Sequence, residues 1–129
     1  MESYKKLKIK NELNGYMLDE INYNEERFIY IYVKDEKKKN KIVVTFSLVC
    51  HGIKITSSES DAGGLTSMLF PFKEGMVYQV LDSDYLKEFY KRSSGMYDEQ
   101  DSFKHYLVYS QEDILEVLTR GNPIFEEID

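Results

Sequence analysis

The residues that could act as nucleophiles or metal ligands are few and scattered along the chain. There is one cysteine, Cys50, and there are two histidines, His51 and His105. A zinc site needs three or four Cys, His or carboxylate ligands at defined spacing, and these residues provide no such motif. Cys50 and His51 are neighbours in a predicted strand, so their side chains point to opposite faces and cannot form a catalytic dyad. We therefore predict no catalytic residue, no cofactor and no metal site, and we interpret Cys50 as a buried apolar side chain.

Two short segments have a superficial likeness to ligand-binding loops. The segment D-A-G-G-L-T-S at 61–67 contains two glycines, but it lacks the lysine and the strand-to-helix step of a phosphate-binding loop. The segment D-E-Q-D at 98–101 lacks the glycine and the distal glutamate of a calcium-binding EF-hand. Both segments are predicted to be solvated turns.

The acidic segment is nevertheless the best candidate for contact with a partner protein. Asp98, Glu99 and Asp101 surround Tyr97 in a stretch with no predicted core role, and tyrosine is enriched in protein interfaces. His105 begins the next predicted strand. It is interpreted either as a structural histidine that is hydrogen-bonded at the strand end or as a partner-contacting group beside these acids. The predicted partner-binding residues are therefore Tyr97, Asp98, Glu99, Asp101 and His105.

The charge of the chain restricts its partners. The formal net charge is −6, with a net +3 over residues 1–56 and a net −9 over residues 57–129. An acidic protein repels phosphate backbones, so nucleic-acid binding is disfavoured, whereas an acidic surface attracts a basic protein. The single cysteine, together with the absence of an apolar run of about 20 residues, predicts a cytoplasmic protein without membrane attachment.

The first half of the chain predicts a β-hairpin. The segment RFIYIYVKD (27–35) alternates as a strand, a polar turn follows at 34–41, and the return strand covers 41–56. A bulge or bend is expected near Gly52 because glycine within a long strand is typical of such a site. Both faces of the first strand are apolar, and we place Ile31 in the core.

The second half predicts two helices. Ser83 caps a helix over about 84–93, and Gly95 sits where a left-handed C-terminal cap belongs. The capping-box pattern S-x-x-D at 110–113 begins a second helix that includes 112–119. Eight residues across the chain are predicted to be buried, namely Phe46, Leu48, Ile31, Leu86, Phe89, Leu107, Ile114 and Leu118.

These elements give a fold class. Strands at 76–81 and 103–109 flank the first helix, and the segment 57–75 is the longest irregular stretch. Hairpin-connected strands come first and helices come late. We predict one α+β domain over residues 1–129, with a mostly antiparallel sheet and two helices toward the C-terminus that cover one of its faces.

The C-terminal part of the chain resembles small uncharacterised bacterial proteins, and some proteins of this size and acidity are immunity proteins. The matching residues are Ser83–Leu86, Phe89, Ser93, Gly95, His105–Val108 and Ile114–Leu118. The resemblance implies a bacterial protein that binds and neutralises a toxin, and it provides no catalytic residue.

The first functional prediction is therefore a protein-binding module, most concretely an immunity protein or antitoxin that occludes a basic toxin. A small-molecule-binding protein or enzyme is the second hypothesis, with a pocket under the 57–75 loop and His51 or His105 as its polar group. A deep pocket that contains a histidine and a carboxylate would favour it. The third hypothesis is a homo-oligomeric structural protein that pairs through a strand edge or through the C-terminal tail.

Overall fold

The elements of the fold come from a computed structural model, which describes residues 2–8, 15–24, 27–33, 40–46, 50–57, 76–97, 102–110 and 113–128. In chain order they are β1 (Ser3–Lys6), β2 (Met17–Asn24), β3 (Arg27–Val33), β4 (Lys41–Phe46), β5 (Cys50–Ser57), β6 (Val77–Leu81), α2 (Asp84–Arg92), β7 (Lys104–Tyr109), β8 (Asp113–Thr119) and β9 (Pro123–Ile128). For β5 only the backbone is described.

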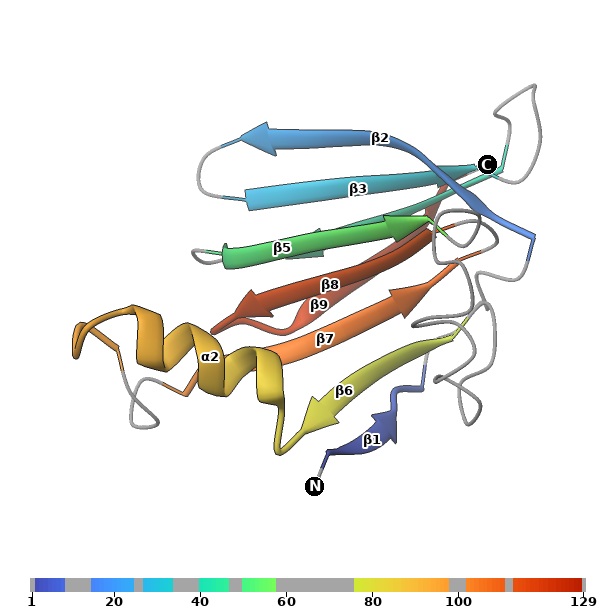
Figure 1. The fold of residues 1–129 in the computed structure, drawn as a ribbon. Helices are drawn as coiled ribbons and strands as arrows, with labels where there is room; N and C mark the ends of the chain where they lie inside the picture. The colour runs from blue at the N-terminus through green and yellow to red at the C-terminus, as the bar shows by residue number, and fades with distance from the viewer. Residues whose placement is uncertain are drawn as a thin grey trace.

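The strands form two antiparallel sheets that pack face to face (Figure 1). One sheet has five strands in the order β1-β6-β7-β8-β5, and the other has four in the order β2-β3-β4-β9. The core between them combines Tyr30, Tyr32 and Phe46 from the four-stranded sheet with Tyr106 and Val117 from the five-stranded sheet. The fold of the described residues is thus a β-sandwich.

The prediction of an α+β fold with two late helices is wrong. The segment expected to be the second helix is β8, which pairs with β7 on one side and with β5 on the other. Leu115 and Val117 face the sandwich core, while Ile114 and Leu118 are buried on the opposite face. A central strand that is buried on both faces has apolar residues on both, and over seven residues this pattern also fits one face of an amphipathic helix.

The first predicted helix is confirmed, and α2 is the one helix among the described residues. The Ser83 Oγ accepts the Leu86 N–H at 3.0 Å, and Gly95 has a φ of +87° just past the helix end. The apolar face of α2 is only half-buried. The prediction that Leu86 and Phe89 are core residues is therefore wrong. Among the described residues, no helix is long and apolar enough to cross a membrane.

The predicted hairpin is confirmed as β3 paired with β4, but the core face of β3 is the opposite one. Tyr30 and Tyr32 are fully buried between the sheets, whereas Ile31 is half-buried on the outer face. Both faces of this strand are apolar, so alternation alone could not decide which one the second sheet would cover. The tyrosine rings bury more apolar area than the isoleucines do, which favours them inside.

The predicted return strand over 41–56 is two strands, because β4 and β5 belong to different sheets. The bulge expected near Gly52 is confirmed, since the register of β5 against β8 shifts between Cys50 and Gly52. Phe46, Leu107, Ile114 and Leu118 are buried as predicted. Leu48 lies outside the described residues, and so do the side chains of Cys50 and His51.

Candidate functional site

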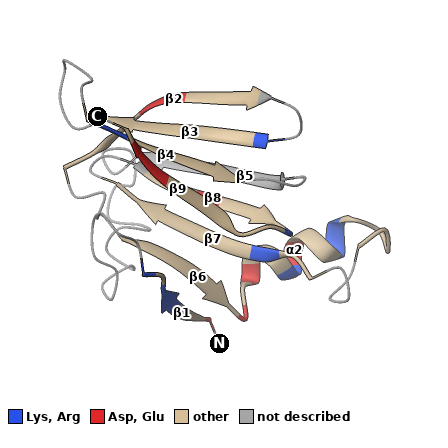
Figure 2. Cartoon of the chain, turned by 180° about the vertical axis from the view of Figure 1, so that it is seen from behind, with Lys and Arg blue, Asp and Glu red and all other residues tan. Residues whose placement is uncertain are grey.

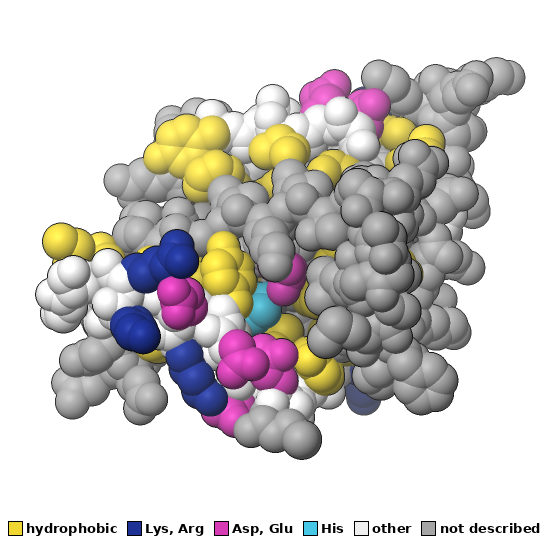
Figure 3. Space-filling view, viewed as in Figure 1, with side chains coloured by type: hydrophobic (Ala, Val, Ile, Leu, Met, Phe, Trp, Pro, Cys, Tyr) yellow, Lys and Arg dark blue, Asp and Glu magenta, His cyan; other side chains and the backbone are white. Residues whose placement is uncertain are grey.

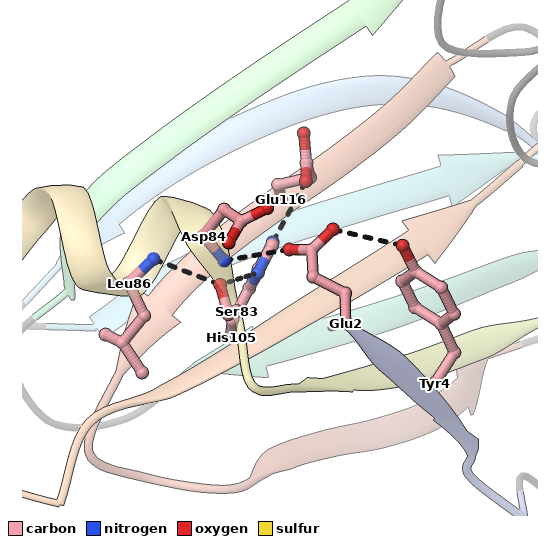
Figure 4. Close-up of polar contacts among 7 residues, drawn as sticks. All are labelled: Glu2, Tyr4, Ser83, Asp84, Leu86, His105 and Glu116. Carbon is pink, nitrogen blue, oxygen red and sulfur yellow. Dashed lines mark hydrogen bonds and ion pairs between the residues drawn. The ribbon is translucent and has the colours of Figure 1, made fainter.

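A buried chain of polar side chains crosses the five-stranded sheet where α2 begins (Figure 4). Ser83 comes from the turn after β6, His105 from β7 and Glu116 from β8. The Ser83 Oγ lies 2.7 Å from His105 Nδ1, and His105 Nε2 lies 2.9 Å from Glu116 Oε1. The three residues are only 3%, 3% and 7% exposed. The network contains three of the buried polar residues in a core that is otherwise mainly apolar.

The hydrogen bonds of this chain have a defined direction when the histidine ring is neutral. A carboxylate only accepts, so His105 Nε2–H donates to Glu116. The other ring nitrogen must then accept, and the Ser83 hydroxyl donates to His105 Nδ1. The Ser83 oxygen in turn accepts the Leu86 N–H at 3.0 Å. The chain therefore connects the first turn of α2 to the two strands beneath it.

Serine, histidine and a carboxylate are also the components of a hydrolase triad, but this arrangement differs from one. The acid bonds Nε2 and the serine bonds Nδ1, which is the reverse of the usual use of the two ring nitrogens. A cleft of about 270 Å³ between β6 and α2 borders Ser83, yet neither His105 nor Glu116 lines it. Because the Ser83 oxygen is buried and caps the helix, we conclude that the Ser83–His105–Glu116 hydrogen-bond network anchors α2.

Carboxylates gather around this anchor. The Glu2 side chain accepts the backbone N–H of Asp84 at 2.9 Å and the hydroxyl of Tyr4 at 3.1 Å. Burial and the charge of Glu2 raise the pKa of Tyr4. Negative groups are favoured at a helix N-terminus, which explains this placement without catalysis. Figure 3 shows Asp and Glu side chains around the cyan histidine on this face of the molecule.

Tyr97 packs into an aromatic cluster. Its ring stacks on Phe89 with centroids 5.7 Å apart and meets Phe103 edge-on at 5.3 Å. The Arg120 guanidinium lies 5.5 Å from the Tyr97 ring centroid, within cation–π range. The expectation that nothing near Tyr97 requires its burial is therefore wrong, because Phe89 of α2 and Phe103, just before β7, supply two aromatic partners.

The other predicted contact residues divide into two groups. Asp98, Glu99 and Asp101 lie outside the described residues. His105 is buried with Ser83 and Glu116, and the ring of Tyr85 meets its ring edge-on at 5.3 Å. The interpretation of His105 as a structural histidine is the one that its surroundings favour.

An exposed apolar surface lies on β2, which sequence reasoning did not single out. Ile21 pairs with Tyr30 and Tyr23 pairs with Phe28 in the β2–β3 register, so both side chains point toward the side of the second sheet. Yet Ile21 is 47% exposed and Tyr23 is 64% exposed. Figure 1 shows the reason, because β2 lies beyond β5, the last strand of the facing sheet. We call Ile21, Tyr23 and Phe28 the β2 overhang.

The overhang is aromatic at its centre and acidic along its strand. The Tyr23 and Phe28 rings lie 4.8 Å apart. Asp19 precedes Ile21 by two residues on β2, while Glu20 pairs with Ile31 and faces the outer side. Figure 3 shows hydrophobic side chains gathered over β2 and β3. The alternation of Ile21 and Tyr23 was a possible sequence signal, but their exposure depends on how the two sheets are offset.

No model of a known protein family matches this chain, and no curated protein or solved structure is significantly similar to it. Within the described residues, no group of three or more His, Cys, Asp and Glu side chains is placed to hold a metal ion. The resemblance to immunity proteins accordingly stays a prediction.

Proposed function

We propose that the protein is a protein-binding module that contacts its partner through the β2 overhang. Its most concrete form is an immunity protein or antitoxin that occludes a basic toxin in the bacterial cytoplasm. The observation that carries the proposal is the 64% exposure of Tyr23 on a strand side that elsewhere forms the core.

The chemistry of the overhang supports a protein partner. Contiguous apolar side chains at a protein surface commonly belong to interaction sites, and tyrosine provides apolar area together with a hydroxyl that stays satisfied in water. Tyr23 and Ile21 lie on β2, which is an edge strand of its sheet among the described strands. A partner surface that covers them would bury the apolar area that β5 leaves open.

The charge near the overhang supports a basic partner. Asp19 lies two residues before Ile21 on β2, and the whole chain carries a net charge of −6. Rim carboxylates accelerate association with a basic protein, while a desolvated aromatic at the centre slows dissociation. Many protein–protein interfaces have this arrangement, with an apolar centre and a polar rim.

A site-specific photo-crosslinker tests the proposal. A benzoylphenylalanine at Tyr23 faces the overhang, and one at Asn22, the next residue on β2, faces the opposite side as a matched control. Each variant would be expressed in its native cells and irradiated, and adducts would be identified by mass spectrometry. We expect one basic protein to be captured from position 23 and not from position 22.

Three outcomes would overturn the proposal. No adduct, or equal adducts from both positions, would remove the overhang as an interface. An adduct of the chain with itself would favour the homo-oligomeric hypothesis instead. If the captured protein is a toxin, the purified chain should also inhibit its activity, and the Tyr23→Ala variant should inhibit it more weakly.

A further inference from the structure

The opposite margin of the sandwich has a cleft of about 390 Å³ with a different character. It lies where β1, β6 and β7 pass under the free side of β9, the last strand of the four-stranded sheet. Figure 2 shows β6 and β1 continuing beyond β9 at this margin. Here the five-stranded sheet extends past the four-stranded one, so no described strand of the other sheet covers its inner side.

Three lysines line this cleft, in a chain that is acidic overall. Lys5 pairs with Gln79 in the β1–β6 register, on the inner side of the sheet, and Lys8 and Lys104 complete the set. Lys5 and Lys8 make no ion pair with a carboxylate in the described part of the chain. Figure 2 shows lysines on β1 and on β7 at this end of the molecule. The cleft therefore concentrates positive charge that no described carboxylate neutralises.

Hydrogen bonds that involve Asn122 and Tyr106 position the Lys104 side chain. Its Nζ donates to Asn122 Oδ1 at 2.9 Å, and the Tyr106 hydroxyl donates to the same oxygen at 2.9 Å. Burial raises the pKa of Tyr106, so its hydroxyl stays protonated as a donor. Asn122 is thus held by two donors, and the ammonium of Lys104 is fixed at the cleft wall.

The remaining surfaces of the cleft suit an extended chain. Leu7, Pro123 and Phe125 provide an apolar lining beside the lysines. Among the described strands, β9 pairs with β4 only, and its residues Pro123 and Phe125 line the cleft, so main-chain groups of its free edge lie beside the cleft. An added strand at that edge would lie over β6 and β1, on the inner side that no described strand covers.

We propose that this margin binds an extended acidic peptide, which pairs with the edge of β9 and places its carboxylates among Lys5, Lys8 and Lys104. Side chains alternate across a strand, so carboxylates at every second position would face the lysines. The residues between them would extend the outer face, where Ile124 and Ile128 are 49% and 46% exposed. This binding surface is separate from the β2 overhang and does not depend on the proposed function.

The shape of the margin favours a single strand over a second copy of the chain. A second copy that paired its own β9 here would bring its five-stranded sheet into the layer that β1 and β6 already occupy. Neighbouring strands lie about 4.8 Å apart, so one added strand fits above β6 and β1, whereas two overlapping sheets do not.

The test uses a ten-residue peptide that alternates glutamate with valine or threonine. Binding would be measured by titration of the ¹⁵N-labelled protein, with amide shifts followed in β9 and β1. We expect saturable binding that the Lys5→Gln/Lys104→Gln double variant weakens about three- to tenfold, as the loss of two partly exposed ion pairs predicts. Lys6→Gln is the matched control because Lys6 points to the other side of β1, and it should change the affinity less than about twofold.

Four results with the unmodified peptides would overturn the proposal. These are no saturable binding, equal weakening by Lys6→Gln, shifts that lie away from β9 and β1, and tighter binding of a peptide with lysine in place of glutamate. A peptide with N-methyl groups along one edge separates strand pairing from simple anion binding. Equal affinity of that peptide would refute the added strand, and loss of its binding would support it. Concentration-dependent dimerisation in sedimentation experiments, reversed by the acidic peptide, would also contradict the steric argument against a second copy.

Discussion

The two margins of the sandwich expose different chemistry for the same geometric reason. At one margin β2 extends past β5 and exposes Ile21 and Tyr23, with acidic residues nearby on the strand. At the other margin β1 and β6 extend past β9 and expose lysines above an apolar lining. The offset of the sheets creates both surfaces, but the residues on each strand decide what each surface can bind. What this protein binds therefore depends on the residues at its margins and not on the fold alone.

The largest expected effect lies between the margins, in the core that both depend on. Phe46 is fully buried and lies edge-on to Tyr30, with centroids 5.8 Å apart. Phe46→Ala should lower the free energy of unfolding by about 3–5 kcal/mol, as buried phenylalanine truncations do. Urea denaturation followed by tyrosine fluorescence would measure it.

The contrast with a margin residue makes this measurement informative. Tyr23→Ala removes a similarly large ring from the overhang and should change stability by less than about 0.5 kcal/mol. If Tyr23→Ala destabilised the protein as strongly as Phe46→Ala, the overhang would be part of the core and not an interface.

The next effect concerns the buried chain that anchors α2. Glu116→Leu keeps a similar volume but removes the acceptor of His105 Nε2–H, which lies in a buried position. An unsatisfied buried donor costs about 1–3 kcal/mol, so the variant should be destabilised by that amount. Chemical denaturation and amide exchange of α2 would show it, and Ser83→Ala should lose about 1 kcal/mol through the lost helix cap.

Binding at the two margins should be unaffected by this change. A Glu116→Leu variant that still folds but binds neither partner would connect the anchor to function and contradict its purely structural assignment. Glu116→Gln retains an acceptor oxygen and should recover most of the lost stability.

The sequence predicts local structure in this protein better than it predicts tertiary arrangement. Ser83 caps the start of α2, and the chain leaves the helix after Ser93 through Ser94 and Gly95, which both have positive φ, because capping depends on a few adjacent residues. The segment 112–119 misled the prediction because its apolar residues fit a helix as well as a strand that is buried on both faces. Glu116 in the middle of the apolar run I-L-E-V-L was the missed signal, since a charge there needs a buried partner.

The candidate sites were harder to predict than the strands. Lys5 and Lys104 line the same cleft only because β1 and β7 flank β6. Hydrophobic periodicity does not predict the order of strands in a sheet. The exposure of Tyr23 depends on where β5 ends the facing sheet. The acidic loop was predicted from its charge and from a tyrosine with no predicted core role. The aromatic packing around Tyr97 depends on Phe89 of α2 and on Phe103 just before β7, which the sequence alone does not bring together.

A smaller effect is expected when the variant of each margin is tested with the ligands of both margins. Tyr23→Ala should weaken the basic protein partner by about tenfold or more, as loss of a central aromatic contact does. The same variant should leave the affinity for the acidic peptide unchanged. The Lys5→Gln/Lys104→Gln variant should show the reverse pattern. Calorimetry of both variants with both ligands measures this, and parallel losses would mean that the margins form one site.

The smallest expected effect is a change in the pKa of Asp82, which is paired with Lys87 and not with a lysine of the cleft beside β9. Asp82, just after β6, lies 2.6 Å from Lys87, and the hydrogen bond from Lys87 lowers the pKa of Asp82 from 3.8 to about 2. Because this pKa is lowered in the folded state, its contribution to stability is present above pH 3.8 and is lost as the pH falls through about 2. Both side chains are exposed, so the contribution is small. Carboxyl ¹³C titration should find the low midpoint, and Lys87→Gln should raise it toward 3.8. Lys5→Gln should leave it unchanged, and a shift caused by Lys5→Gln would mean that Asp82 neutralises the cleft after all.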